Sequence, residues 1–466
     1  MKKILLLNLP GDEIYLRDYY CSFISEGDFV WHPVDLTVLS GILSSDYQIK
    51  VIDAIADRIK FDECCKKISS MDIDTIIFLS GAVSWEKDKE FLKKIKRVKQ
   101  IKLIGTGDLF LFQGEKILRE NKFLDALILD FTDSEILKFL SAGKGLFKNI
   151  IYRDREQIVI PKKITKKNKI FSLPLPRLDL FPMAKYDFPI ARHFPFATVV
   201  ASLHCPYHCR FCIYNSLEFK WRDADNVIEE LKYIYSLGIK EVRFRDNTFG
   251  ANRNQALDIC RKMLLNNFNF SWSCSSRVDV LDEELLEIMK KSGCHIIQLG
   301  VESGNQGTLD CYNKQFTLNQ VRKMFSLCQK LGIRTMAHFI LGLPGEDEEA
   351  ILNTLKFAVE LNCDFVTFNI AAPRIGTDLR KNAISKGWLI DNTLKCSDSS
   401  RTYPAIETEE LSRKKLWELR NKAIRRFYLR PSYIIKRIFS LKSLYELKMD
   451  IREGLLYLIS SFKRGL

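Results

Sequence analysis

Cysteine is sparse in this sequence and long apolar runs are missing, and each shortage excludes a class of protein. Thirteen cysteines in 466 residues are too few for a disulfide scaffold. No stretch approaches the roughly 18 consecutive apolar residues of a membrane-spanning helix. The apolar run Ile4–Leu9 follows Lys2 and Lys3 as in an export signal, but it ends at once in Pro10, which favours a buried strand. We therefore expect a globular, cytoplasmic chain with reduced cysteines and two or three domains.

Acidic residues are also in short supply. The chain has 72 Lys and Arg against 58 Asp and Glu, a formal net charge of +14, and residues 401–466 hold 16 basic against 7 acidic residues. A nucleic-acid enzyme would interleave basic residues with exposed aromatic ones or append a binding module. The sequence has neither feature, so a nucleic-acid partner is not expected. Solvated charge, an acidic substrate and anionic lipid remain as explanations of the basic surplus.

Three of the cysteines lie in one short segment. Cys205, Cys209 and Cys212 form a Cys-x3-Cys-x2-Cys run directly after an apolar stretch. Three thiolates at this spacing suit an iron–sulfur cluster, and three ligands leave one of four irons open to a small molecule. A zinc site would need a fourth ligand, which His204 or His208 would have to supply. Disulfides would need an oxidising compartment.

The run resembles the signature of the radical S-adenosylmethionine (SAM) superfamily, in which an aromatic residue, here Phe211, precedes the last cysteine. The resemblance implies a [4Fe–4S] cluster held by Cys205, Cys209 and Cys212, with SAM bound at the open iron. It implies reductive cleavage of SAM to a 5′-deoxyadenosyl radical, which abstracts hydrogen from an unactivated carbon. An electron donor such as flavodoxin or ferredoxin is implied as a partner.

Residues 196–385 repeat a strand and a helix six times. The predicted strands lie at 196–203, 241–245, 270–275, 295–301, 334–341 and 365–371. The resemblance implies a partial (β/α)6 relative of the TIM barrel, the radical SAM core. In such barrels the chemistry lies at the carboxyl ends of the strands.

Polar residues and glycines follow these strands in order. By resemblance they contact SAM, and they are Asp246 and Asn247, Arg277, Glu302 and Ser303, and Gly342. Each has a simpler explanation, because Asp246 or Glu302 could cap a helix and Arg277 could pair with Asp279. Five such features at successive strand ends are harder to explain in that way. His338, in the middle of a strand, is interpreted as a core histidine and not as a ligand.

Residues 1–145 alternate short apolar runs with amphipathic segments. The runs at 4–9, 49–53, 75–79, 101–105 and 126–129 predict a doubly wound, flavodoxin-like parallel sheet. Such sheets bind ligands at the carboxyl ends of their strands. The sequence places Asp53, Ser80, Gly105 and Gly107 at those ends.

The stretches Val51–Asp57, Phe78–Gly81 and Leu103–Gly107 resemble the cobalamin-binding domain that precedes many radical SAM methyltransferases. The resemblance implies cobalamin as a methyl carrier, contacted by Asp53, Ser80, Gly105 and Gly107. The chain departs from that family by lacking its Gly-Gly loop. The alternative is a domain that has lost its corrin and serves as a docking platform or substrate lid.

Residues 146–195 are predicted to be a Pro-rich linker with a small hairpin, and residues 386–466 a basic helical region. After Pro431, apolar residues at helical spacing alternate with Lys and Arg. Such a helix either lies on a membrane surface or packs its apolar face on its own protein. A lipid-like substrate would suit the first arrangement.

The sequence therefore predicts a radical SAM enzyme that transfers a methyl or other group to an unactivated carbon of a small or lipid-like metabolite, with cobalamin as carrier. A corrin-independent radical enzyme that rearranges, oxidises or inserts sulfur is the alternative, and a non-catalytic iron–sulfur protein is the third. Peripheral membrane contact through the basic tail is an additional expectation. No motif identifies the substrate.

Overall fold

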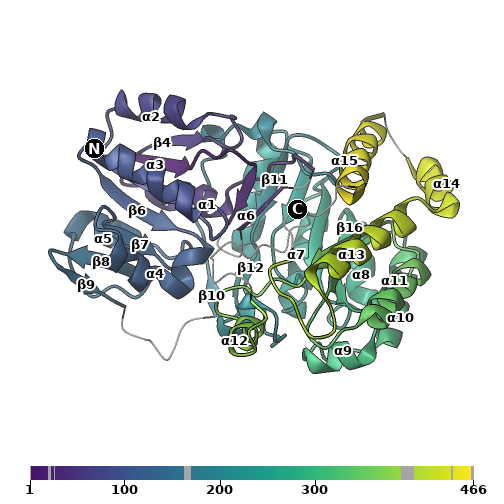
Figure 1. Ribbon diagram of the computed structural model, residues 1–466. Coiled ribbons are helices and arrows are strands. Elements are labelled where there is room, and N and C mark those ends of the chain that lie inside the picture. Colours follow the sequence, from purple (N-terminus) through teal and green to yellow (C-terminus); the bar gives the residue numbers. More distant parts are fainter. Residues whose placement is uncertain are drawn as a thin grey trace. The chain divides into compact units, whose positions relative to one another are not determined.

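The computed structural model describes residues 2–18, 22–25, 27–161, 169–389, 404–441 and 444–462. The chain divides into two compact units, Met1–Asp187 and Phe188–Leu466 (Figure 1). This boundary lies inside the stretch 146–195 that the sequence predicts as a linker. Parts of that stretch and of the predicted region 386–466 lie outside the described residues, namely 162–168, 390–403, 442–443 and 463–466.

The first unit is built from strands and helices that alternate along the chain. Its elements are β1 (Lys3–Asn8), β2 (Tyr15–Arg17), β3 (Ser22–Ile24), α1 (Val34–Leu43), β4 (Gln48–Asp53), α2 (Phe61–Ser69), β5 (Thr75–Leu79), α3 (Trp85–Val98), β6 (Lys102–Thr106), α4 (Asp108–Glu120), β7 (Ala126–Ile128), α5 (Glu135–Ala142), β8 (Ile150–Asp154), β9 (Gln157–Val159), β10 (Ile170–Phe171) and the 3₁₀ turns η1 (Leu178–Leu180) and η2 (Met183–Lys185).

A seven-stranded sheet in the order β4-β1-β5-β6-β7-β8-β9 forms the centre of this unit. The first five strands pair in parallel, as predicted. Strands β1 and β5 are buried almost throughout, as expected for parallel strands with both faces covered. The last two strands are antiparallel and form the hairpin that the sequence placed in the linker. The hairpin extends this sheet because Ile150, Ile151 and Tyr152 are buried against β7.

The second unit continues the alternation. Its elements are β11 (Phe196–Val199), β12 (Ser202–Leu203), η3 (Ile213–Ser216), β13 (Lys220–Arg222), α6 (Ala224–Ser236), β14 (Glu241–Phe244), α7 (Arg253–Leu265), β15 (Ser271–Ser276), α8 (Glu283–Lys291), β16 (Cys294–Glu302), α9 (Gln306–Cys311), α10 (Leu318–Lys330), β17 (Arg334–Leu341), α11 (Glu348–Glu360), β18 (Phe365–Ile370), α12 (Asp378–Ser385), α13 (Arg413–Tyr428), α14 (Pro431–Ser440) and α15 (Leu444–Phe462).

Six parallel strands in the order β11-β14-β15-β16-β17-β18 confirm the predicted partial barrel. Along β17 and β18 every second residue is fully buried and the others are partly exposed. The two sets lie on opposite faces of the sheet, because side chains alternate along a strand. His338 belongs to the partly exposed set and bonds to Thr367 Oγ1 at 2.6 Å and Gln298 Oε1 at 3.3 Å. It is hydrogen-bonded as interpreted, but it is partly exposed and therefore not a core histidine.

The region after the barrel is helical where the structure describes it. Helix α13 packs against β18, α11 and α15 through buried residues that include Leu416, Leu419 and Phe427. It begins at Arg413, and the Ser412 side chain accepts the cap hydrogen bond from the Lys415 backbone N–H. None of the described helices is both long and apolar enough to cross a membrane.

Candidate functional site

The three motif cysteines follow β12 and end where η3 begins. All three are free thiols, with Cys209 buried and Cys205 and Cys212 partly exposed. The Cys212 backbone N–H donates to the Cys209 carbonyl at 3.0 Å, which turns the chain between these two residues. Cys205 Sγ lies 3.2 Å from Thr248 Oγ1, in the segment that follows β14.

The segment between α9 and α10 holds the cysteine loop in place. The Arg210 backbone N–H donates to the Tyr312 carbonyl at 3.1 Å, and Asn313 Nδ2 donates to the His208 carbonyl at 2.9 Å. The ring of Phe211, the predicted aromatic residue of the motif, lies 6.2 Å from the ring of Tyr312 between centroids. Contacts that are distant in sequence therefore fix the conformation of the loop.

A buried arginine contacts the central cysteine. Arg277 Nη1 donates to Cys209 Sγ at 3.4 Å, and the guanidinium lies 3.8 Å from the centroid of the Tyr207 ring. The same group forms a two-pronged ion pair with Asp279 at 2.8 and 2.9 Å. The simple pairing with Asp279 is therefore present, and the contact of Arg277 with SAM stays a prediction. Arg277 therefore ties Cys209 to the segment that follows β15.

A second buried cation, Lys314, was not predicted. Its Nζ bonds to Glu302 Oε1 at 2.9 Å and lies 5.9 Å from the centroid of the Phe211 ring. Burial lowers the pKa of Lys314, but the charges of Glu302 and Cys209 outweigh it and leave the pKa raised. Lys314 therefore stays charged between the cysteine loop and the end of β16.

Glu302 adopts an unusual backbone conformation at the end of β16. Its φ is +71°, a region that side chains other than glycine rarely occupy, and the strand bulges between Gly300 and Glu302. A Cβ on Gly300 would lie 2.5 Å from Glu302 Oε1, so a larger residue there would displace the carboxylate from this position. Such strain is concentrated at functional sites.

The electrostatics of the loop suit a positively charged metal centre. Burial raises the pKa of Cys212 to about 12, and neighbouring Cys209 and Cys205 raise it further. Three thiolates could share this site only with strong positive charge among them, which bound iron supplies. Within the residues that the structure describes, no three or more His, Cys, Asp and Glu side chains gather closely enough to hold one metal ion. The fit to a cluster therefore depends on donor chemistry and the two adjacent cations.

Asp246 and Asn247, after β14, differ in their surroundings. Asp246 is 1% exposed and accepts hydrogen bonds from the Ala201 backbone N–H at 2.8 Å and Ser202 Oγ at 2.6 Å. Burial raises its pKa to about 6. Asn247 Oδ1 is buried and has no hydrogen-bond partner among the described residues. A buried acceptor of this kind needs a donor, such as an ammonium group of a ligand. Asn252 caps α7, so capping does not explain Asp246.

Ser303 and Gly342 meet at Glu346, the last residue of the Gly-Leu-Pro-Gly-Glu stretch after β17. Ser303 Oγ donates to Glu346 Oε1 at 3.0 Å, and the backbone N–H groups of Gly342 and Leu343 donate to Oε2 at 3.1 and 3.2 Å. Gly342 has φ +76°, and a Cβ there would lie 2.4 Å from Leu416. This network joins the ends of β16 and β17 beside the site.

Glu346 gives the network a pH dependence that can be measured. Burial raises its pKa to about 7 from 4.5, although Ser303 and two backbone N–H groups lower it. The folded chain binds the Glu346 proton more tightly than the unfolded chain. The protonated carboxyl therefore stabilises the fold fully below about pH 4.5, and this stabilisation, up to about 3 kcal/mol, is lost as the pH rises through 7. The unfolding midpoint of Glu346→Gln minus that of wild type should therefore increase as the pH is raised from about 5 to 8. Exposed Glu349→Gln is the control, and parallel pH profiles would contradict the assignment.

The four residues predicted at a corrin-binding edge lie at or just beyond the carboxyl ends of β4, β5 and β6. Asp53 accepts hydrogen bonds from Asn8 Nδ2 at 2.8 Å and Tyr186 Oη at 2.9 Å. Ser80 Oγ donates to Asp88 Oδ2 at 2.7 Å. Both side chains are 1% exposed or less, so their polar atoms are used inside the unit.

Gly105 and Gly107 are required by the packing of the chain on itself. A Cβ on Gly105 would lie 2.8 Å from ring carbons of Phe78 and Phe110. A Cβ on Gly107, where φ is +134°, would lie 1.9 Å from the Ser80 carbonyl oxygen. In the described part of the first unit, all four predicted contacts are buried and engaged. Contact between these four residues and a corrin stays a prediction.

Comparisons with known proteins agree with the barrel and its motif. A model of the radical SAM superfamily matches residues 199–358. An uncharacterized methyltransferase of Pyrococcus horikoshii, PH0819, is 31% identical over 420 residues, which cover 87% of this chain and 90% of that protein. This similarity extends over both units.

Two solved structures share the fold. OxsB, a cobalamin-dependent SAM radical enzyme with aqua-cobalamin and SAM bound, matches with a TM-score of 0.72 at 14% identity, over 99% of this chain and 72% of that one. TsrM of Kitasatospora setae, a radical SAM methyltransferase with cobalamin and a [4Fe–4S] cluster bound, matches with a TM-score of 0.64 at 15% identity, over 84% of this chain and 76% of that one. The chain therefore belongs to the radical SAM superfamily, in the subgroup whose barrel follows an N-terminal cobalamin-binding-like domain.

Proposed function

We propose that this enzyme transfers a methyl group from SAM to an unactivated carbon of a small or lipid-like metabolite. The observation that carries the proposal is the cysteine loop, in which Cys205, Cys209 and Cys212 lie beside two buried cations, Arg277 and Lys314. A [4Fe–4S] cluster held by these cysteines would supply the electron that cleaves one SAM to methionine and a 5′-deoxyadenosyl radical, and a second SAM would supply the methyl group. A one-electron donor such as flavodoxin or ferredoxin is the expected partner.

The strand-end residues divide into two groups. Asn247 and Glu302 are partly exposed, and we assign them the direct contacts with the methionyl and ribose parts of SAM. The orphaned Asn247 Oδ1 suits the ammonium group. Asp246 and Ser303 are at most 1% exposed and fully bonded, so they act as positioning residues. Lys314 orients the Glu302 carboxylate.

The remaining predicted residues support these contacts. Arg277 is only 4% exposed and holds Cys209, so its role is to position the loop and stabilise charge on the sulfur. Phe211 packs over the aliphatic and charged end of Lys314. Gly342 allows the backbone turn in which Glu346 binds two N–H groups.

Cobalamin as the methyl carrier is the finer part of the proposal. It is supported by the fold of the first unit and by OxsB and TsrM, both solved with cobalamin bound. Because Asp53, Ser80, Gly105 and Gly107 are engaged within the unit, we assign them no catalytic role. The same observation favours a second candidate, a corrin-independent radical enzyme that rearranges, oxidises or inserts sulfur into its substrate.

Anaerobic reconstitution tests the proposal and separates the two candidates. The chain is loaded with iron and sulfide, reduced with dithionite and supplied with SAM, and 5′-deoxyadenosine is measured by mass spectrometry. We expect 5′-deoxyadenosine to form in both cases. Retention of hydroxocobalamin through gel filtration, seen in its corrin spectrum, would support the methyl carrier, whereas its loss would favour the corrin-independent enzyme. A chain that is fully loaded with iron but makes no 5′-deoxyadenosine would contradict both.

A further inference from the structure

Helix α14 places its polar side against the protein. Tyr433 Oη donates to the Asp364 carbonyl at 3.0 Å, and Lys436 Nζ donates to the Asn362 carbonyl at 2.7 Å. Arg437 forms a two-pronged ion pair with Asp450 of α15 at 2.6 and 2.8 Å. The basic and hydroxyl side chains of this helix are therefore used for attachment to the body of the second unit.

The apolar side of α14 faces away from that body. Ile434, Ile435, Ile438 and Phe439 are 43%, 56%, 59% and 85% exposed. An amphipathic helix on a globular protein normally buries its apolar stripe and exposes its charges. The reversed arrangement shows that the apolar side chains are not used to fold this unit, and they form an exposed patch that calls for an apolar partner.

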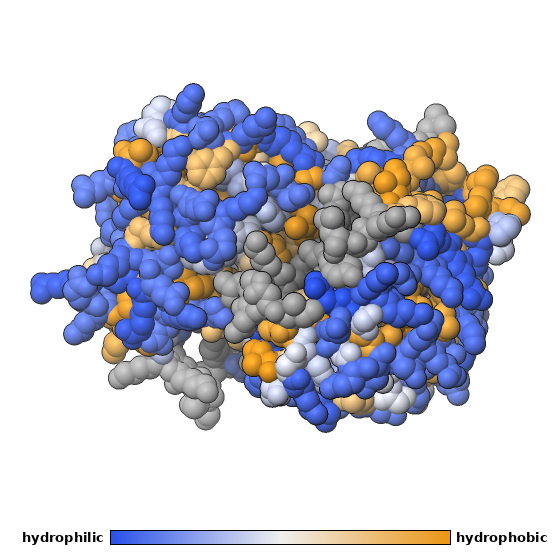
Figure 2. Space-filling view, in the orientation of Figure 1, coloured by the Kyte–Doolittle hydropathy of each residue, from blue (hydrophilic) through white to orange (hydrophobic). Residues whose placement is uncertain are grey.

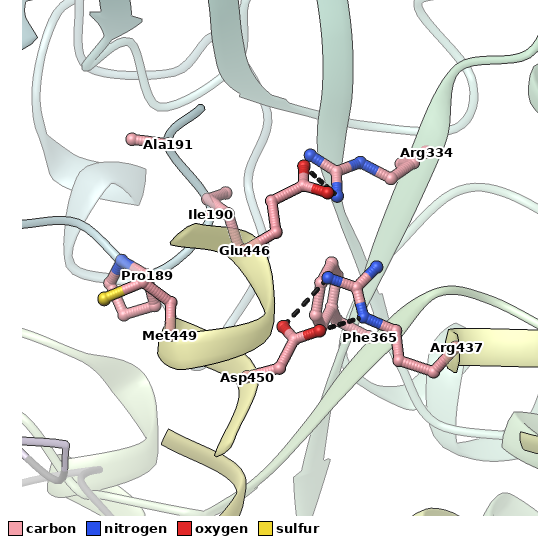
Figure 3. A pocket seen from close by; sticks show the side chains of 9 residues that line it. All are labelled: Pro189, Ile190, Ala191, Arg334, Phe365, Arg437, Glu446, Met449 and Asp450. Carbon is pink, nitrogen blue, oxygen red and sulfur yellow. Dashed lines mark hydrogen bonds and ion pairs between the residues drawn. The ribbon is translucent and has the colours of Figure 1, made fainter. Parts of the chain in front are cut away.

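Helix α15 continues the pattern. Its inner side carries Met449 and Glu446, which are 5% and 7% exposed, and Glu446 pairs with Arg334 at 3.4 Å. Figure 3 shows both ion pairs, Glu446–Arg334 and Asp450–Arg437, among the residues that line a small pocket. Arg334 begins β17, so this pocket lies at the opposite end of the strand from the predicted catalytic edge. Its ion pairs fasten α15 to the barrel.

The outer side of α15 carries apolar residues at helical spacings of three or four positions. Leu447, Ile451, Leu455, Ile459 and Phe462 are 37%, 52%, 54%, 54% and 66% exposed. We call these residues, with the four exposed ones of α14, the α14–α15 apolar face. Figure 2 shows the surface over these two helices as hydrophobic, at the upper right.

The charges around this face select the kind of partner. The α14 sequence contains no Asp or Glu. The acids of α15 are Glu446, Asp450 and Glu453, and each is paired with an arginine. Residues 401–466 carry 16 basic against 7 acidic residues. A second copy of so basic a surface would be repelled, whereas an anionic surface would be attracted.

We propose that the α14–α15 apolar face binds an anionic lipid membrane, with both helices lying in the interfacial plane. Neither helix is long and apolar enough to span a bilayer. An exposed apolar stripe can instead lie at the membrane interface, and here exposed Lys448 follows Leu447 of the stripe while each described acid of the two helices is paired. The face would bring the barrel to a membrane surface. This inference does not depend on the cluster chemistry.

Flotation of the full-length chain with lipid vesicles tests the proposal. The vesicles are phosphatidylcholine alone, or phosphatidylcholine with about one-third phosphatidylglycerol, at physiological salt. The chain should float with the anionic vesicles and remain behind with the neutral ones. Ile438→Ser combined with Phe439→Ser should lower the bound fraction about tenfold or more. Leu264→Ser combined with Leu265→Ser is the matched control, since both leucines are exposed on α7 at 38% and 79%.

Two outcomes would overturn the proposal. One is wild-type chain that does not float with anionic vesicles, or a double variant that floats equally well with folding confirmed by circular dichroism. The other is a dimer, detected without lipid by sedimentation, that the Ile438 and Phe439 substitutions dissociate, because the face would then be an interface between copies. Neither result changes the formation of 5′-deoxyadenosine, so a failure here is distinct from a failure of the proposed function.

Discussion

Replacing Cys209 with alanine is expected to remove cluster iron and to lower 5′-deoxyadenosine formation by more than about a hundredfold. Loss of a residue that only supports a metal ligand already costs about 10–100-fold, and loss of the ligand itself should exceed that. Cys209 also accepts the hydrogen bond of Arg277, so the substitution leaves a buried guanidinium without its sulfur partner. Iron content by plasma spectroscopy and 5′-deoxyadenosine yield after anaerobic reconstitution are the two measurements.

The matched control is Cys311→Ala, because Cys311 is an exposed free cysteine outside the loop. It should keep both iron and activity. Full iron binding by Cys209→Ala would contradict the ligand assignment. Stoichiometric zinc in the purified chain, with no iron taken up on reconstitution, would instead favour the zinc alternative that His204 or His208 would complete.

The barrel could be predicted because its strands are short apolar runs at regular spacing. Each of the six strands of the barrel sheet, β11 and β14 to β18, overlaps a predicted run. The edge strands of the first sheet were harder to predict from the sequence. The β8–β9 hairpin was predicted, but its attachment to β7 depends on pairing across the α5 connection, which no local pattern reports.

The residues of the candidate site could likewise be predicted only in part. Residues that directly follow strands, such as Asn247 and Glu302, could be found from strand order alone. Lys314 could not, since it follows a helix in a segment without a motif, and its meaning comes only from contact with Glu302 and the Phe211 ring. The sequence also could not separate contact residues from positioning residues. That distinction depends on burial, as for Asp246, which is bonded on both oxygens.

The β2–β3 hairpin was missed for a related reason. Its strands, Tyr15–Arg17 and Ser22–Ile24, are three residues each and contain an arginine in a buried position. A buried arginine normally argues against a core strand. Arg17 forms an ion pair with Asp88, which is 71 residues away in the sequence. A local sequence pattern therefore cannot predict this partner.

That buried ion pair should be the most sensitive point of the first unit. Arg17 and Asp88 have fully buried side chains 2.8 Å apart, and Arg17 also donates to Ser84 Oγ and to the Leu9 carbonyl. Burial raises the pKa of Asp88, against the lowering effects of Arg17 and its serine neighbours, so desolvation is not fully offset. Such a pair adds little net stability, but removing one partner leaves an uncompensated buried charge.

Asp88→Ala is therefore expected to destabilise the first unit by about 3–5 kcal/mol, whereas Arg17→Met combined with Asp88→Leu should recover most of that loss. Hydrogen exchange of β5 and α3 amides, followed by mass spectrometry of the intact chain, reports this unit separately from the barrel. The exposed pair Lys94–Asp62, with side chains 49% and 79% exposed, supplies the control, because Asp62→Ala should change the stability little. Equal effects of Asp88→Ala and Asp62→Ala would show that the Arg17 guanidinium reaches water in solution, and the hairpin would then not be held at the strand ends as the structure has it.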